Sequence, residues 1–196
     1  MPNWCQNSLT ISNEDVSKID ALQNYIHDNK RAFDFLRPYQ PSLESQEQTH
    51  HDETVGIMPF WYEWNVENWG CKWDMELQDF ERLDEYTLLI NFDTAWSPPI
   101  ALYEYLDNLV DDGWTLNAMY NEPGVGFCGW YGEIDNFHVN ESWSYDFDNF
   151  EESIKDIPEE LREWANLDHE MEILKDENEE DKVLKQERED YNESGK

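Results

Sequence analysis

Residues 86–99 read YTLLINFDTAWSPP and join the clearest strand of the chain to the start of a helix. The Tyr, Thr, Ile and Phe side chains over 86–96 predict a strand, because aromatic and β-branched residues fit a pleated, half-buried surface. Ser97 is expected to cap the helix that follows, with Pro98 at its first position, and Gly113 is expected to end it. That helix has an apolar face at helical spacing, made of Leu102, Tyr105, Leu106 and Leu109.

A similar strand and helix open the chain. Residues 3–12 predict a strand that contains several polar residues. Ser12 is expected to start a helix over residues 14–28, with Asp15 three positions on as a capping box. Phe33 and Phe35 indicate a short strand after this helix.

The remaining strands complete a recognisable order. Residues 75–80 predict a strand that a turn joins to the strand at 86–96, and residues 115–120 and 126–134 predict two more around a Pro123-Gly124 turn. The order is strand, helix, strand, strand, helix, strand and one extra strand. This order predicts an α+β fold, a ferredoxin-like split βαβ antiparallel sheet with two helices on one face. We expect it to occupy residues 1–146, with a polar loop insertion near 38–56.

The C-terminal residues 147–196 predict an acidic helical extension. After Pro158, apolar side chains recur at spacings of three and four, at Leu161, Trp164, Leu167, Met171 and Leu174. This stripe predicts a helix that docks onto the chain's own domain. A homodimer through the same helix is the alternative.

Negative charge extends over the whole chain. The sequence has 46 Asp and Glu against 13 Lys and Arg, for a net charge of −33, and it also has ten Trp. Residues 1–146 carry 27 acidic and six basic side chains, so the body itself is acidic, at −21. Such a surface repels nucleic acid and anionic lipid and attracts basic grooves. We therefore expect a protein partner and neither direct nucleic-acid binding nor a membrane.

The cysteines and the apolar runs indicate a cytoplasmic protein. Cys5, Cys71 and Cys128 are far apart and odd in number, which argues against a disulfide framework and against a zinc site. No secretory signal and no membrane-spanning run is recognised in the sequence. No nucleophile elbow, zincin helix or EF-hand loop occurs either, so we predict a protein that is not an enzyme and has no cofactor or metal.

Three sequence blocks resemble a known family. They are Met1–Cys5 with Asn7, the NWGCKWD block at 68–74, and the FDTAWSPP block at 92–99. Together they resemble the YubB-like ferredoxin-like proteins of phages and plasmids, although Cys71 stands where that family usually has Thr. The resemblance implies a ferredoxin-like fold and a mobile-element origin, and it supplies no catalytic residues.

An acidic phage-like protein suggests an inhibitor of host defence. The hypothesis is a DNA-mimic-like protein that binds the basic nucleic-acid surface of a defence nuclease or effector, such as a CRISPR or restriction complex. A net charge of −21 matches that of roughly 36 Å of duplex DNA. The carboxylates expected to contact the partner are Glu104, Asp107, Asp111, Asp112, Glu159, Glu160 and Glu163.

A tryptophan-rich block supports a second hypothesis, a small-ligand pocket. Its residues are Trp61, Trp64, Asn68, Trp69, Trp73 and Asp74. Aromatic rings with carboxylates bind cations, and aromatic rings can also stack on a nucleobase. Base stacking is disfavoured here because only Lys72 falls in the block. The third reading is a core whose indole N–H groups are satisfied by Asn and Asp side chains.

Overall fold

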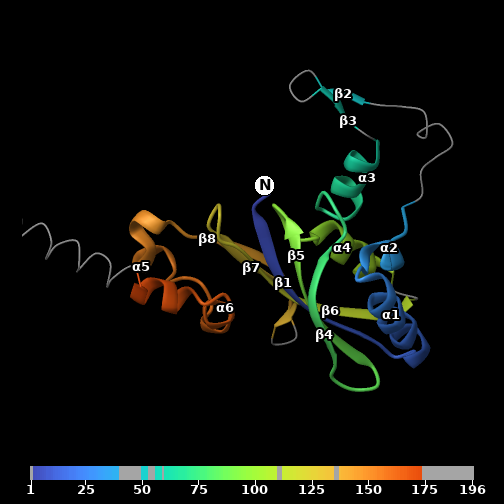
Figure 1. Cartoon of the computed structure of the whole chain (residues 1–196). Helices are drawn as coiled ribbons and strands as arrows, with labels where there is room; N and C mark the ends of the chain where they lie inside the picture. Colours follow the sequence, from blue (N-terminus) through green and yellow to red (C-terminus); the bar gives the residue numbers. More distant parts are fainter. Residues whose placement is uncertain are drawn as a thin grey trace, which may run out of the picture. The chain divides into compact units, whose positions relative to one another are not determined.

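The computed structural model describes residues 2–39, 50–52, 56–58, 60–109, 112–134 and 137–173. The chain divides into two units, residues 1–143 and 144–196, and each is described by itself. Figure 1 shows the chain coloured along its sequence. Among the described residues, no helix combines the length and the apolar character that crossing a bilayer requires.

The first unit is built on a six-stranded sheet with the order β4-β5-β1-β6-β7-β8. The pairs between β4 and β5, β5 and β1, β1 and β6, and β6 and β7 are antiparallel. The strands are β1 (Trp4–Asn13), β4 (Glu76–Arg82), β5 (Thr87–Ala95), β6 (Trp114–Glu122), β7 (Phe127–Ile134) and β8 (Phe137–Ser144). The predicted α+β class with an antiparallel sheet is confirmed. The sheet is larger than predicted, since β8 was not expected.

In the described part of the first unit, four helices and a small hairpin accompany the sheet. The helices are α1 (Val16–Asn29), α2 (Phe33–Leu36), α3 (Phe60–Asn68) and α4 (Ile100–Asn108). β2 (His50–Asp52) pairs with β3 (Gly56–Met58) and forms a hairpin at the end of the stretch near 38–56 where a loop insertion is predicted. The rest of the predicted loop after Tyr39 lies outside the described residues.

The core lies on one face of the sheet. Alternate side chains of β1, such as Leu9 and Ile11, are buried, as the period of two requires. They share one apolar cluster with Leu22 of α1 and Leu106 of α4, so both helices pack on this face. Each such side chain stabilises the fold by about 1.5–3 kcal/mol relative to an exposed one.

Two of the predicted helix starts are wrong. Ser12 belongs to β1, and Asp15 itself caps α1 by accepting a hydrogen bond from the Ser17 N–H at 3.0 Å. Ser97 does not cap α4, whose N-cap is Pro99, because the Ser97 hydroxyl donates instead to the Gly70 carbonyl at 2.7 Å. At α1 the nearer carboxylate of Asp15 replaces the expected cap. At α4 a tertiary contact removes the hydroxyl of Ser97 from the capping position.

The short strand predicted at Phe33 and Phe35 is a helix, α2. Its first N–H groups would otherwise lack partners. The Asp74 carboxylate supplies the acceptors from a distant part of the sequence: it accepts hydrogen bonds from the N–H groups of Ala32, Phe33 and Asp34 at 3.3, 3.1 and 3.0 Å. A residue about 40 positions away therefore determines this helix.

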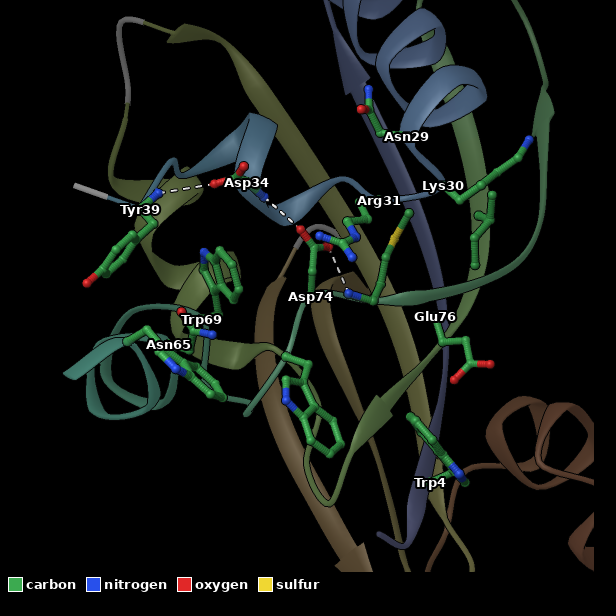
Figure 2. A pocket seen from close by; sticks show the side chains of 14 residues that line it. Trp4, Asn29, Lys30, Arg31, Asp34, Tyr39, Asn65, Trp69, Asp74 and Glu76 are labelled. Atoms are coloured by element: carbon green, nitrogen blue, oxygen red, sulfur yellow. Dashed lines mark hydrogen bonds between the residues drawn. The ribbon is translucent and has the colours of Figure 1, made fainter. Parts of the chain in front are cut away.

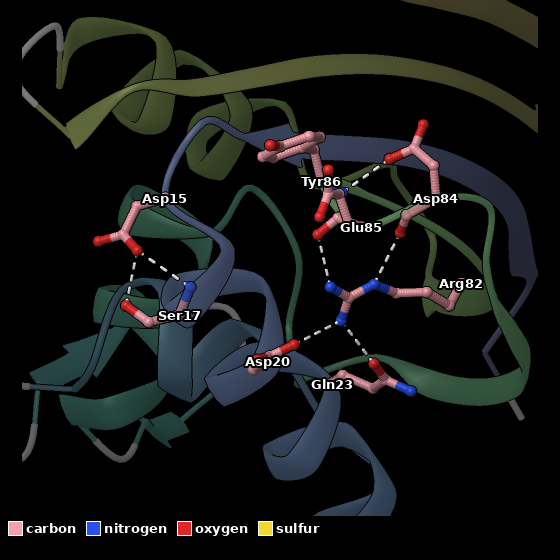
Figure 3. A network of polar contacts seen from close by, with 8 residues as sticks. All are labelled: Asp15, Ser17, Asp20, Gln23, Arg82, Asp84, Glu85 and Tyr86. Atoms are coloured by element: carbon pink, nitrogen blue, oxygen red, sulfur yellow. Dashed lines mark hydrogen bonds and ion pairs between the residues drawn. The ribbon is translucent and has the colours of Figure 1, made fainter.

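Arg82 fastens the turn between β4 and β5 to α1 (Figure 3). Its Nη1 donates to the Asp20 carboxylate at 2.9 Å and to the Gln23 side chain at 2.7 Å. Its Nε donates to the Asp84 carbonyl at 2.7 Å, within the turn. One guanidinium group thus joins two elements that are distant in sequence.

The second unit contains short helices, which are η2 (Phe147–Asn149), α5 (Phe150–Ser153) and α6 (Glu159–Trp164), followed by helical residues 167–173. The single long helix predicted after Pro158 is wrong, because Asn166 has a left-handed φ of 59° and separates two helical segments. Leu161 and Leu167 are buried, and Leu174 lies outside the described residues. The predicted homodimer through this stripe stays a prediction.

Candidate functional site

A pocket with a volume of about 810 Å³ lies in the first unit (Figure 2). It is bounded by the start of β1, the end of α1, α2, α3, the loop before β4 and the start of β4. Its lining residues are Trp4, Asn29, Lys30, Arg31, Asp34, Tyr39, Trp61, Asn65, Trp69, Trp73, Asp74, Met75, Glu76 and Leu77. We call it the tryptophan pocket.

Three polar contacts and one glycine hold the loop at residues 69–75 in place. The Asp74 carboxylate accepts from the N–H of Met75 at 2.8 Å, in addition to the helix α2 amides. The Asn65 side chain donates to the Lys72 carbonyl at 2.8 Å, and the Trp69 indole N–H donates to the Arg37 carbonyl at 3.0 Å. Gly70 has a φ of +90°, and a Cβ there would lie 3.1 Å from backbone nitrogens of α4. The block that resembles the YubB-like family therefore serves as scaffold.

Asp74 is part of this scaffold and is not an exposed ligand-binding carboxylate. Burial raises the pKa of Asp74, and the backbone hydrogen bonds that it accepts oppose that shift. Its oxygens are held by four N–H donors in all. Its function in the pocket is therefore to position the wall.

The predicted tryptophan residues divide between pocket and core. Trp61 and Trp73 line the pocket and are 36% and 39% exposed, whereas Trp69 lines it but is buried. Trp64 does not line the pocket, and it packs edge-on against Trp69 with ring centroids 5.6 Å apart. Asn68 does not line it either, and it donates to the Trp64 carbonyl at 2.9 Å.

A lysine of the chain itself covers the aromatic faces that a cation would need. The Lys72 ammonium lies 4.4 Å from the Trp73 ring centroid and 5.1 Å from that of Trp96. These two rings stack on each other at 6.3 Å with an interplanar angle of 26°. Because the cation–π positions of Trp73 and Trp96 already hold Lys72, the structure disfavours the cation cage considered from the sequence.

Among the pocket residues that sequence reasoning missed are Trp4, Lys30 and Arg31. Trp4 is 39% exposed at the first position of β1, and Lys30 and Arg31 follow the last turn of α1. They could not be recognised from the sequence, because they precede the block at 61–74 by 30 to 57 positions. Only the antiparallel sheet and α1 bring these side chains to the tryptophan residues.

Lys30 and Arg31 differ from Lys18 and Arg82, two other cations of this unit. Within the described ranges, no carboxylate forms an ion pair with either of them. By contrast, Lys18 pairs with Asp112 at 3.0 Å and Arg82 with Asp20 at 2.9 Å. Two cations without a carboxylate partner among the described residues therefore line the tryptophan pocket.

Two of the predicted acidic contact residues line a second pocket, of about 510 Å³. Glu104 and Asp107 of α4 share it with Glu133 and His138. Asp107 accepts a hydrogen bond from the Tyr131 hydroxyl at 2.6 Å. Burial first, and then Asp107, raise the pKa of Tyr131. Asp107 is therefore partly engaged within the fold, whereas Glu104 is exposed.

The other predicted acidic residues are placed separately. Asp112 is exposed and pairs with Lys18, and Asp111 lies outside the described residues. Glu159, Glu160 and Glu163 are exposed on α6, in the second unit. Among the described residues of the first unit, Glu104 and Asp107 are the predicted acidic residues that share a site.

The cysteines have the properties of core residues. Cys5, Cys71 and Cys128 are free and buried. Burial raises the pKa of all three, that of Cys128 to about 12, so the thiolate form is disfavoured at neutral pH. In the described part of the chain, no three His, Cys, Asp or Glu side chains gather as a metal site would require.

Comparisons with known proteins give limited information. No family model matches the chain, and no curated protein sequence matches it. The chain is similar to the crystal structure of protein Api92 from Yersinia pseudotuberculosis, described under the family model DUF1281. The TM-score is 0.44 and the identity 12%, over 74% of this chain and 99% of that chain. This similarity assigns no family or function, and the resemblance to YubB-like proteins stays a prediction.

Proposed function

We propose that the chain is a non-catalytic phage or plasmid protein that inhibits a host defence system in the bacterial cytoplasm. It binds the basic nucleic-acid-binding surface of a nuclease or effector, such as a CRISPR or restriction complex, through its exposed carboxylates. A ferredoxin-like core carries this surface. The order β4-β5-β1-β6, with α1 and α4 on one face, supports that core, to which β7 and β8 would be an addition.

The inhibitor proposal rests on how charged side chains are distributed over the first unit. The body has a net charge of −21, and two of its six cations, Lys18 and Arg82, are already paired with carboxylates. Glu104 and Glu133 remain exposed around one concave site beside α4. A concave acidic site suits a protruding arginine or lysine of a basic groove.

The test is a pull-down from a defence-positive bacterial lysate, eluted along a salt gradient and identified by mass spectrometry. We expect a nucleic-acid-handling protein that moderate salt releases. A variant with Glu104→Lys and Glu133→Lys should release it at lower salt. The control variant carries Glu14→Lys and Glu81→Lys, which have the same charge change at other exposed sites. Equal retention of the partner by all three proteins would contradict the proposal.

The second candidate function is binding of a small ligand in the tryptophan pocket. Its volume of about 810 Å³ falls within the range of roughly 300–1,000 Å³ that ligand sites occupy. Indole fluorescence reports on such binding directly. The suitable variant is Trp73→Ala, because Trp69 is buried and its replacement would damage the core. A fluorescence response that Trp73→Ala leaves unchanged would contradict binding at this pocket.

A further inference from the structure

We propose that the tryptophan pocket binds a planar aromatic ring that carries one anionic group, with a nucleoside 5′-monophosphate as the simplest member of this class. The inference rests on the ligand-binding function proposed above and specifies its ligand. It combines two features that the sequence keeps apart, the exposed indoles and the unpaired cations.

The ring is recognised by exposed indoles. Trp4, Trp61 and Trp73 line one pocket and each keeps more than a third of its surface in solvent. Large apolar side chains left exposed around a cavity indicate a binding surface, and indole faces stack on any nucleobase because every base has a π-face. Figure 2 shows the side chains from β1, α1 and the loop before β4 around this pocket. The ring would stack on Trp4 or Trp61 and contact the exposed part of Trp73, because Lys72 and Trp96 already lie against the Trp73 ring.

The anionic group is recognised by Lys30 and Arg31. Both line the pocket, and neither has an ion-pair partner within the described residues. A guanidinium offers two parallel N–H donors to phosphate oxygens, and an ammonium adds a point charge. Because the other charged lining residues are Asp34, Asp74 and Glu76, the pocket as a whole is not positive. It therefore suits a ligand with one anionic group, bound at Lys30 or at Arg31, rather than a polyanion.

Two alternatives fit the same pocket less well. A cationic ligand would meet Lys30 and Arg31, and the faces of Trp73 and Trp96 already hold Lys72. A nucleic-acid strand would bring many phosphates to a body with a net charge of −21. The end of a strand nevertheless presents the same ring and phosphate as a free nucleotide, so the test separates these two sources.

The experiment titrates the full chain with the four nucleoside 5′-monophosphates and follows indole fluorescence and calorimetry. At least one is expected to bind saturably, and its nucleoside and inorganic phosphate to bind at least tenfold more weakly. The variant Lys30→Gln with Arg31→Gln should lose at least tenfold in affinity, and so should Trp73→Ala. Lys18→Gln is the matched control, since Lys18 is a basic residue paired with Asp112, and it should bind as the native chain does. Circular dichroism and thermal unfolding establish that each variant is folded.

Each contrary result has a distinct meaning. Equal affinity for the nucleoside, or unchanged affinity after loss of Lys30 and Arg31, overturns the anionic assignment and leaves a pocket that binds neutral rings. If a 5′-phosphorylated oligonucleotide binds more tightly than any mononucleotide, the assignment of a free nucleotide is overturned and the ligand is the end of a strand. Competition by choline overturns the anionic ligand in favour of a cation. If none of these probes changes the fluorescence or the Tm, both this inference and the ligand-binding function fail.

Discussion

The two ends of the sheet use their charged residues differently. At the end formed by the β4–β5 turn, Arg82 is bound to Asp20, Gln23 and the turn backbone, so its charge stabilises the fold. At the opposite end, Lys30 and Arg31 border the tryptophan pocket without such partners in the described chain. The carboxylate of Asp74 beside them is occupied by backbone amides. Residues of the same chemical type thus stabilise the fold at one end and remain available for a ligand at the other.

Among the proposed variants, Asp74→Ala should cause the largest loss of stability. It would leave four backbone N–H groups without their acceptor and uncap α2. We expect the free energy of unfolding to fall by at least about 3 kcal/mol, since each of the three partly buried N–H groups costs roughly 1–3 kcal/mol without a partner and the Asp34 N–H is exposed. Urea unfolding measures it. Glu76→Ala is the control at an exposed neighbour and should change stability by less than about 0.5 kcal/mol. A loss from Asp74→Ala no larger than this would show that the pocket wall does not depend on the cap.

Alkaline pH should lower the free energy of unfolding, because the sheet that joins the two ends buries Cys128 and Tyr120. Burial raises the pKa of Cys128 from 9.0 to about 12, and that of Tyr120 from 10.0 to about 12. The unfolded chain loses these protons first, so their stabilising contribution is complete below pH 9 and is lost as the pH rises towards 12. Each group contributes a slope of at most about 1.4 kcal/mol per pH unit. Denaturant unfolding at pH 8, 9, 10 and 11 measures this, and Cys128→Ala should reduce the slope. An unchanged slope in that variant would contradict the assignment to Cys128.

Arg82→Ala should destabilise the fold without affecting the pocket. It removes donors to Asp20 and Gln23 and to the turn backbone, and a partly exposed network of this kind contributes about 1–2 kcal/mol. Arg82→Lys should recover only part of the loss, since an ammonium cannot reproduce the planar fork. Unfolding midpoints measure both variants. A loss of nucleotide affinity equal to that of the variant with Lys30→Gln and Arg31→Gln would remove the distinction between the two ends.

Lys30→Gln with Arg31→Gln should have the smallest effect on stability. Because neither cation forms an ion pair in the described part of the chain, the free energy of unfolding should change by less than about 0.5 kcal/mol. Thermal and urea unfolding of this variant, beside Arg82→Ala, provide the comparison. A loss as large as that of Arg82→Ala would show that these residues stabilise the fold and are not kept for a ligand.

The sequence predicted most of the sheet, because strand patterns are local. Alternating apolar residues on β1 and β5 match the face that packs on the core. Local patterns failed where a distant group supplies the partner. Asp74 converts the Phe33–Phe35 segment into a helix, and Gly70 takes the hydroxyl of Ser97 away from helix capping. Asn166 interrupts the C-terminal stripe with a backbone conformation that spacing does not reveal.

The pocket was predicted only in part, for the same physical reason. Trp61 and Trp73 were named from their density in one block, but a run of indoles does not reveal which of them face solvent. In the structure Trp61 and Trp73 are exposed, whereas Trp69 is buried and belongs to the core. Arg31 gave no signal because a single residue outside a motif resembles any other helix terminus. Trp4 belongs to one of the blocks that resemble the YubB-like family, but that resemblance supplied no site residue.

The sequence by itself determined the charge, the α+β class and the position of the main strands, since these depend on composition and on short-range periodicity. Only the tertiary structure decided where charge is neutralised and where it stays available. Pairing such as Lys18 with Asp112, or the covering of Trp73 by Lys72, joins residues through space. An ion pair or a pocket wall forms where folding brings two segments within a few ångströms, and no local pattern in either segment specifies that approach.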